Sequence, residues 1–85
     1  MDDIEQHIEA LIFASEKSIS LMEINQVLEC AFEYKFPEVE IQSAIANIFK
    51  KYSHHAIELV YLNEGYQFLT KKDYHNTINQ LQRIR

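Results

Sequence analysis

The sequence predicts a mostly helical α+β fold, and two observations carry this prediction. Two short helices, each apolar along one face, follow one another within residues 18–52. Two β-rich segments come next, separated by a turn that holds the only glycine of the chain. Tandem helices followed by a hairpin are the order of a winged helix-turn-helix. We therefore expect a three-helix core with a short strand, a β-hairpin wing and a C-terminal helix.

Length and composition set the class of protein. The 85 residues are enough for a single domain, 1–85, and a hydrophobic fraction of 47% can fill a compact core. The single cysteine, Cys30, excludes an internal disulfide, and we expect it to be a small buried hydrophobe. The acidic start is unlike a signal peptide, and no apolar run is long enough to span a membrane. We expect a cytoplasmic protein.

The first helix is predicted over residues 3–14, with Asp2 and Asp3 as acidic partners of its N-terminus. Its core face comprises Ile4, Ile8, Leu11, Ile12 and Ser15. Two alanines and Phe13 widen the apolar arc beyond what one core face needs. Either a small domain buries this helix on two sides, or Phe13 belongs to a subunit contact.

Residues 18–36 are predicted as a short strand, a helix and a corner. Ser20 and Glu23 have the spacing of a capping box at the start of the second helix. The apolar stripe of that helix consists of Leu21, Ile24, Val27, Leu28 and Ala31. The aromatic segment 31–36 either extends the helix by a turn or forms a longer corner.

The third helix is predicted from Pro37, at its first helical position, with Glu38 and Glu40 in the first turn. Its apolar stripe consists of Ile41, Ala44, Ile45, Ile48, Phe49 and Tyr52. The stripe faces the same core as the first two helices.

The wing is predicted as strands 57–62 and 66–70, with a turn at 63–65 in which Gly65 adopts a positive φ. Both faces of the first strand carry apolar side chains, and a two-stranded wing covers only one of them. Val60 and Leu62, or the opposite row with Tyr61, are then left for a partner, together with Tyr66. The alternative is that the last helix folds back over the second face.

The last helix is predicted to start at 70–73, with Thr70 as its cap and Asp73 as the capping-box acid. Its stripe consists of Tyr74, Ile78, Leu81 and Ile84. The chain ends at Arg85 within this helix without a stop signal. We expect 1–85 to be the N-terminal fragment of a longer two-domain protein.

The residues offer no catalytic constellation, cofactor motif or metal site. A single glycine excludes a glycine-rich phosphate loop, and the four histidines are typical of exposed positions. Residues 1–49 hold ten acidic and two basic side chains, whereas 50–85 hold six basic and three acidic ones. The acidic part includes both helices of the helix-turn-helix, so we expect direct DNA binding to be weak or absent. The alternative is a transcription regulator fragment that contacts phosphates through Lys50, Lys51, Lys71 and Lys72.

Four segments resemble the segregation and condensation protein B (ScpB) family, in its N-terminal winged-helix domain. They are IEALIFAS at 8–15, ISL at 19–21, IEL at 57–59 and GYQF at 65–68. The resemblance implies a non-enzymatic accessory subunit of the bacterial SMC condensin complex, without cofactor or metal, in chromosome condensation and segregation. It also implies a homodimer that binds the kleisin, segregation and condensation protein A (ScpA), and through it the SMC protein, at the nucleoid. The interface residues we expect are Phe13, Val60, Tyr61, Leu62 and Tyr66.

Overall fold

A computed structural model describes residues 4–85 as four α-helices and a two-stranded antiparallel hairpin, which confirms the predicted fold class. The elements are α1 (Ile4–Ala14), α2 (Leu21–Phe32), α3 (Glu38–Lys51), β1 (Ile57–Leu62), β2 (Gly65–Thr70), a 3-10 turn η1 (Lys72–Tyr74) and α4 (His75–Ile84). The predicted caps Asp2 and Asp3 lie outside the described residues.

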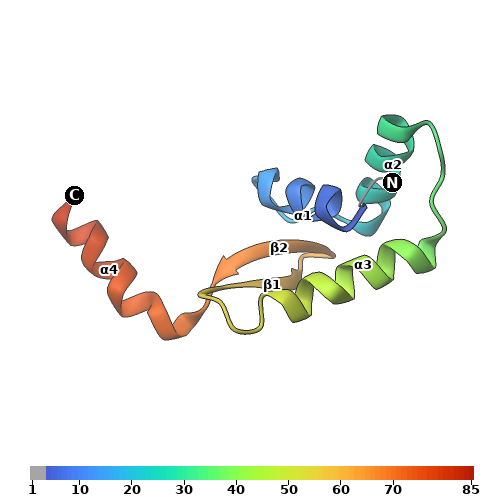
Figure 1. The fold of residues 1–85 in the computed structure, drawn as a ribbon. Coiled ribbons are helices and arrows are strands. Elements are labelled where there is room, and N and C mark those ends of the chain that lie inside the picture. The colour runs from blue at the N-terminus through green and yellow to red at the C-terminus, as the bar shows by residue number, and fades with distance from the viewer. Residues whose placement is uncertain (1–3) are drawn as a thin grey trace.

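The core lies between α1, α2, α3 and the inner face of the hairpin. α1 packs along α3, and the hairpin runs beside both helices (Figure 1). The largest fully buried side chains are Ile8, Ile12, Ile24, Leu28, Ile41 and Ile48. All six come from the apolar stripes predicted for the three helices, so helical periodicity alone identified the centre of the core.

The start of α2 has the predicted capping box. The Ser20 hydroxyl accepts from the Glu23 amide at 3.1 Å, and the Glu23 carboxylate accepts from the Ser20 amide at 3.0 Å. The helix ends at Phe32 because Glu33 adopts a left-handed conformation, with φ of 52°. Residues 33–36 therefore form a corner, in which the Phe36 ring packs edge-on against Phe32 with a centroid distance of 5.4 Å.

α3 starts one residue later than predicted. Pro37 is the N-cap rather than the first helical residue, with an extended ψ of 140°, and Glu38 is the first residue of the helix. The Pro37 carbonyl still accepts from the Glu40 amide at 3.0 Å. The predicted stripe is also wider than the buried face, because Phe49 at its edge is 39% exposed.

The wing turn differs from the prediction in a way that the backbone explains. Positive φ values occur at Asn63 (53°) and Glu64 (60°), whereas Gly65 has none. Two successive left-handed residues joining two antiparallel strands are typical of a type I′ turn. Gly65 instead begins β2 beside Ile19, whose backbone pairs with Tyr66 in both directions at 2.9 and 2.8 Å. The predicted short strand at 18–20 is therefore a single bridge to the wing.

Cys30 is exposed, so its predicted burial is wrong. The buried positions of α2 are Ile24 and Leu28. Residues two apart on a helix do not share a face, so Cys30 points away from the side that Leu28 buries. Within residues 4–85, no second layer covers the outer side of α2, and this side carries a shallow apolar hollow around Val27, Cys30 and Ala31.

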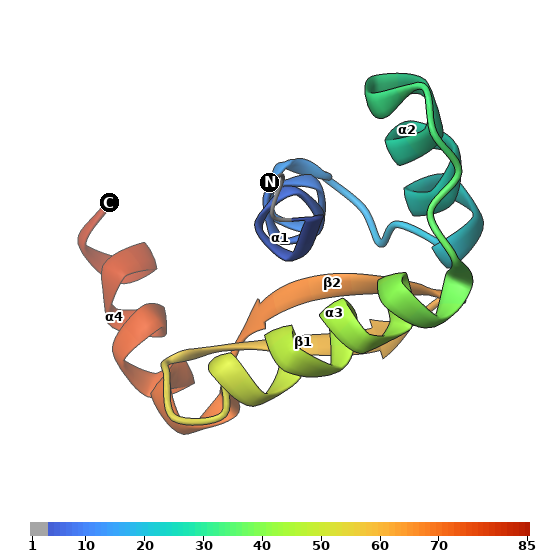
Figure 2. The same ribbon diagram turned by 45° about the vertical axis from the view of Figure 1, so that its right-hand side comes forward.

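The start of the last helix is also corrected. Thr70 is the last residue of β2, and the chain then forms η1 before α4 begins at His75 with no side-chain cap. The two ribbon views show α4 leaving the end of the hairpin and projecting away from the three-helix core (Figures 1 and 2). This projection gives the molecule its elongated shape, 47 × 24 × 23 Å. α4 therefore does not fold back over the second face of the wing.

Candidate functional site

A groove of about 450 Å³ lies between the C-terminal half of α1 and the base of the hairpin. Ala10 and Phe13 line it from α1, and Ile57 and Phe68 line it from the two strands. Ile57 and Phe68 share the inner face of the wing with Leu59, which is buried in the core. The apolar walls of the groove are therefore a continuation of the core that reaches solvent.

One end of the groove is a charged cluster that ties α1 to the end of α3. Glu9 accepts from the Lys51 ammonium at 2.7 Å and from the Tyr52 hydroxyl. Lys51 also lies 3.8 Å from Glu5. The hydrogen bond from Lys51, followed by that from Tyr52, lowers the pKa of Glu9, while the bond to Glu9 raises the pKa of both Lys51 and Tyr52. Lys51 neutralises the charge of Glu9, the acidic residue that lines the groove, so the groove presents mainly its apolar wall to a partner.

Phe13 lies at the mouth of this groove with 74% of its surface exposed. The alternative that the domain buries α1 on two sides is therefore wrong. An exposed phenylalanine beside an apolar groove is a typical feature of a protein interaction surface. Full burial of such a side chain by a partner is worth roughly 1.5–3 kcal/mol.

Tyr61 and Tyr66 are directly opposite one another at the turn end of the wing, with ring centroids 5.0 Å apart. Tyr61 is 61% exposed, whereas Tyr66 is partly buried against the core and contacts Phe49 edge-on. Burial raises the pKa of the Tyr66 hydroxyl. Tyr61 is thus the accessible member of the pair, and Tyr66 mainly supports it.

Val60 and Leu62 alternate with the core-facing residues of β1, so they occupy the outer face of the wing. The register places Leu69 of β2 on the same face, 40% exposed. The structure therefore distributes the five predicted interface residues over three places. Phe13 lies at the groove, Tyr61 and Tyr66 lie at the turn end of the inner face, and Val60 and Leu62 lie on the outer face.

Ala10, Ile57, Phe68 and Leu69 complete these surfaces and were missing from the predicted interface. A sequence shows that a strand has two apolar faces, but only the cross-strand register shows which face the core covers. Leu69 could have been assigned to the outer face by pairing the two strands, because it lies directly opposite Glu58, which is on that face.

Two of the four lysines predicted for phosphate contacts have partners within the chain. Lys51 pairs with Glu9, and the Lys71 ammonium donates to the Ser53 carbonyl at 2.6 Å. In DNA-binding proteins with a helix-turn-helix, the start of the second helix contacts the bases. In this chain the corresponding first turn of α3 carries Glu38 and Glu40. This end of α3 repels phosphates, so the charges disfavour a DNA interface there.

Across residues 4–85, no three His, Cys, Asp or Glu side chains gather as metal ligands would. None of the described helices is both long and apolar enough to cross a membrane.

The sequence profile of the segregation and condensation complex subunit ScpB matches residues 6–85. The chain belongs to the ScpB family. The matched region contains α2, α3, α4, the whole wing and all but the first two residues of α1, so the groove and the wing surfaces belong to the ScpB domain itself.

Two solved structures are similar to this ScpB-family chain. A conserved hypothetical protein from Chlorobium tepidum is 28% identical, with a TM-score of 0.72, and the match covers 92% of this chain and 47% of that one. A dimer of the ScpB N-terminal domain complexed with a ScpA peptide is 26% identical, with a TM-score of 0.79, and the match covers 95% of this chain and 93% of that one. The chain therefore spans about half the length of the Chlorobium protein. No curated protein matches it.

Proposed function

We propose that this chain is a non-enzymatic accessory subunit of the bacterial SMC condensin complex, acting in chromosome condensation and segregation. In this role it self-associates and binds the kleisin ScpA, through which it reaches the SMC protein. The observation that carries the proposal is the apolar groove between α1 and the wing, with Phe13 exposed at its mouth, in a domain of the ScpB family. The similar ScpB domain that was solved as a dimer with a ScpA peptide supports both kinds of contact.

The three surfaces suit a module that holds more than one partner at once. The groove and the outer face of the wing lie on opposite sides of the hairpin, so a subunit bound at Phe13 leaves Val60 and Leu62 free. We assign Phe13 to self-association. Tyr61, Val60 and Leu62 then remain for the kleisin, and Tyr66 supports Tyr61 from below.

Two further parts of the proposal concern the whole protein. The 47% coverage of the Chlorobium chain, together with the close fit to an ScpB N-terminal domain, supports 1–85 as the first of two domains. Because the SMC protein acts on the chromosome, we expect the chain to be located in the cytoplasm, at the nucleoid.

The test compares the two classes of partner in one series of titrations. The chain is titrated by calorimetry with the ScpA kleisin of the same genome, and by fluorescence with a labelled duplex DNA at low salt. We expect saturable binding of ScpA and no DNA binding at high micromolar protein. Binding of DNA that weakens steeply with salt, without binding of ScpA, would overturn the proposal in favour of the regulator fragment.

A further inference from the structure

α2 carries apolar side chains on the side that faces away from the core. Ile24 and Leu28 bury its inner side, whereas Val27 is 41% exposed, and Cys30 and Ala31 are exposed as well. A helix that covers a core usually has charged and polar residues on its outer side. Packing within the described part of the chain therefore does not account for the apolar outer side of α2.

The exposed apolar residues of α2 form a row with a hollow in it. Val27, Cys30 and Ala31 are three and four residues apart, so they are neighbours on the helix surface. Together with Gln26 they line a hollow of about 400 Å³. A row of this spacing is the kind of surface on which another helix docks through its own apolar stripe.

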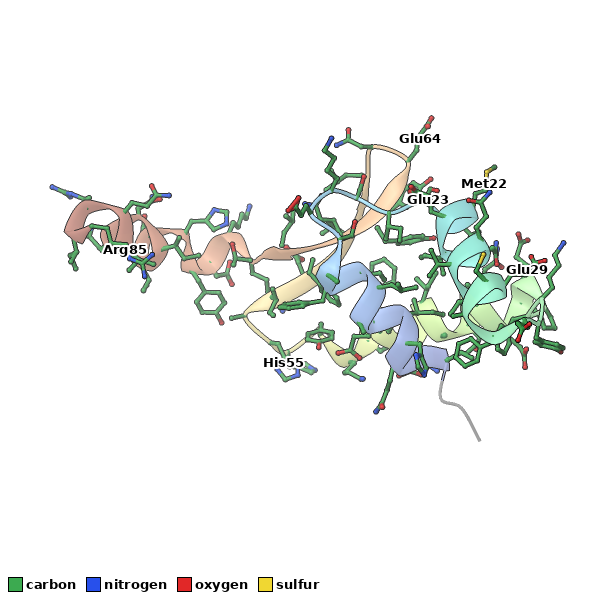
Figure 3. The ribbon with its side chains drawn as sticks, turned by 90° about the horizontal axis from the view of Figure 1, so that it is seen from above. Met22, Glu23, Glu29, His55, Glu64 and Arg85 are labelled. Carbon is green, nitrogen blue, oxygen red and sulfur yellow. The ribbon has the colours of Figure 1, made fainter. Side chains whose placement is uncertain are left out.

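A second row of side chains runs beside the first and is acidic. Gln26, Glu29 and Glu33 are spaced by three and four residues, and Met22 precedes them by one turn. Gln26 and Glu29 also line a second hollow beside the first. Figure 3 shows Met22 and Glu29 on α2, at the end of the molecule opposite to Arg85. An apolar row and an acidic row therefore lie side by side along α2.

The charges of the acidic row have no counterpart in the described part of the chain. Residues 21–36 hold three acidic side chains and one basic one, Lys35. Neither Glu29 nor Glu33 forms an ion pair with another residue of the range 4–85. A partner with Lys or Arg beside its apolar side chains would therefore match both rows at once.

The basic helix of this chain, α4, does not have the matching pattern. Its apolar stripe runs through Ile78 and Leu81, and Arg83 is two residues from Leu81, on a different side of the helix. Lys71 and Lys72 precede α4 and are not part of it. Lys and Arg side chains thus form no row beside the stripe of α4, which favours a helix of a different protein over a second copy.

We propose that the outer side of α2 binds an amphipathic helix of another protein. The apolar stripe of that helix packs on Val27, Cys30 and Ala31, and its flanking Lys or Arg side chains pair with Glu29 and Glu33. This surface shares no residue with the groove or with the wing, so it adds a partner that the proposed function does not contain.

The test uses a designed peptide and the whole chain. The probe is a synthetic peptide of about 18 residues, long enough to form a helix in water, with Leu along one stripe and Lys in the row beside it. One control peptide has the same composition in an order that destroys the stripe. The other control is the synthetic segment 71–85, which contains α4. Calorimetry measures the affinity, and the shifts of backbone amide resonances in two-dimensional NMR spectra locate the contact.

We expect the probe to shift the amide resonances of α2 and to bind at least about tenfold more tightly than either control peptide. One helix docked on one helix buries little surface, so we expect the affinity to be modest and to fall as salt is added. Shifts confined to the groove or the wing, or equal binding of the peptide without a stripe, would overturn the proposal. Tighter binding of 71–85 than of the probe would overturn it in favour of a second copy.

Two pairs of variants test the two rows separately. Val27→Asp is compared with Val39→Asp, the same change at an exposed valine of α3, and Glu29→Lys is compared with Glu40→Lys, which alters the net charge equally. We expect Val27→Asp and Glu29→Lys each to weaken binding of the probe by about tenfold, and the two controls to change it by less than about twofold. Circular dichroism checks folding, and Glu29→Lys, at an exposed position, decides the case if Val27→Asp does not fold. Equal effects within a folded pair would overturn the proposal.

The same variants distinguish this proposal from the proposed function. Val27→Asp and Glu29→Lys are expected to leave self-association and the binding of ScpA unchanged, because neither residue lines the groove or belongs to the wing. Loss of ScpA binding in both variants would assign α2 to the kleisin and overturn a separate site. A parent chain that binds the probe at α2 but not ScpA would overturn the proposed function alone.

Discussion

Gly65 packs directly on the backbone of Ile19: a Cβ atom at residue 65 would lie 2.9 Å from the Ile19 carbonyl carbon and 3.0 Å from its oxygen. Both groups are backbone, and the Ile19 backbone is held by its two hydrogen bonds to Tyr66. Neither side has room to move. The only glycine of the chain is therefore required by close approach between the wing and the strand residue before α2, and not by the turn.

Gly65→Ala is expected to destabilise the domain by about 1–3 kcal/mol, the usual cost of inserting a methyl group where there is no space. Urea unfolding followed by circular dichroism measures the loss. The matched control is Glu64→Gly, which relieves a left-handed residue and is expected to leave stability unchanged or raise it by up to about 1 kcal/mol. A Gly65→Ala variant as stable as the parent would contradict the packing at Ile19.

The cluster of Glu9, Lys51 and Tyr52 predicts how stability depends on pH. The lowered pKa of Glu9 means that its contribution is fully present above the ordinary value of 4.5 and is lost as pH falls through the lowered pKa. The raised pKa values of Lys51 and Tyr52 mean that their contributions are lost as pH rises beyond the ordinary 10.5 and 10.0. Unfolding free energies of the parent and of Glu9→Gln are compared across this range. The two are expected to differ at neutral pH and to converge below pH 4.5; a constant difference would show that Glu9 acts only through packing.

Ser20→Ala removes the hydroxyl of the capping box and is expected to cost about 0.5–2 kcal/mol of stability. Thr70→Ala serves as the comparison, because Thr70 looks like a cap in the sequence but ends a strand in the structure. Its replacement is expected to change stability by less than that of Ser20. Thermal unfolding of the two variants decides the point, and equal losses would contradict the assignment of the caps.

The sequence predicted the parts of this fold that depend on local pattern. Ile8, Ile24 and Ile48 recur at helical spacing, and Ser20 with Glu23 forms a capping box from neighbouring residues alone. Prediction failed where distant segments meet. Gly65 is required by its contact with the backbone of Ile19. Cys30 is exposed because none of the elements in the described part of the chain covers the outer side of α2.

The candidate site shows the same division. The apolar arc, wider than one core face, singled out Phe13 but left open whether the domain buries it or exposes it. The groove beneath it needs Ile57 and Phe68 from strands far along the chain. The course of α4 depends on hydrogen bonds from Lys71 to the loop before β1, which no periodicity in the sequence reveals.

Phe13→Asp tests the central claim that this ScpB-family domain self-associates through the groove between α1 and the wing. The side chain is 74% exposed in the single chain, so the change is expected to spare the fold and to place a charge against an apolar partner surface. Sedimentation velocity of the parent and the variant is measured over a range of concentrations, with far-ultraviolet circular dichroism as the check of folding. We predict a dimer for the parent and a folded monomer for Phe13→Asp. A parent that stays monomeric, a variant that stays dimeric, or a variant that unfolds would contradict the claim.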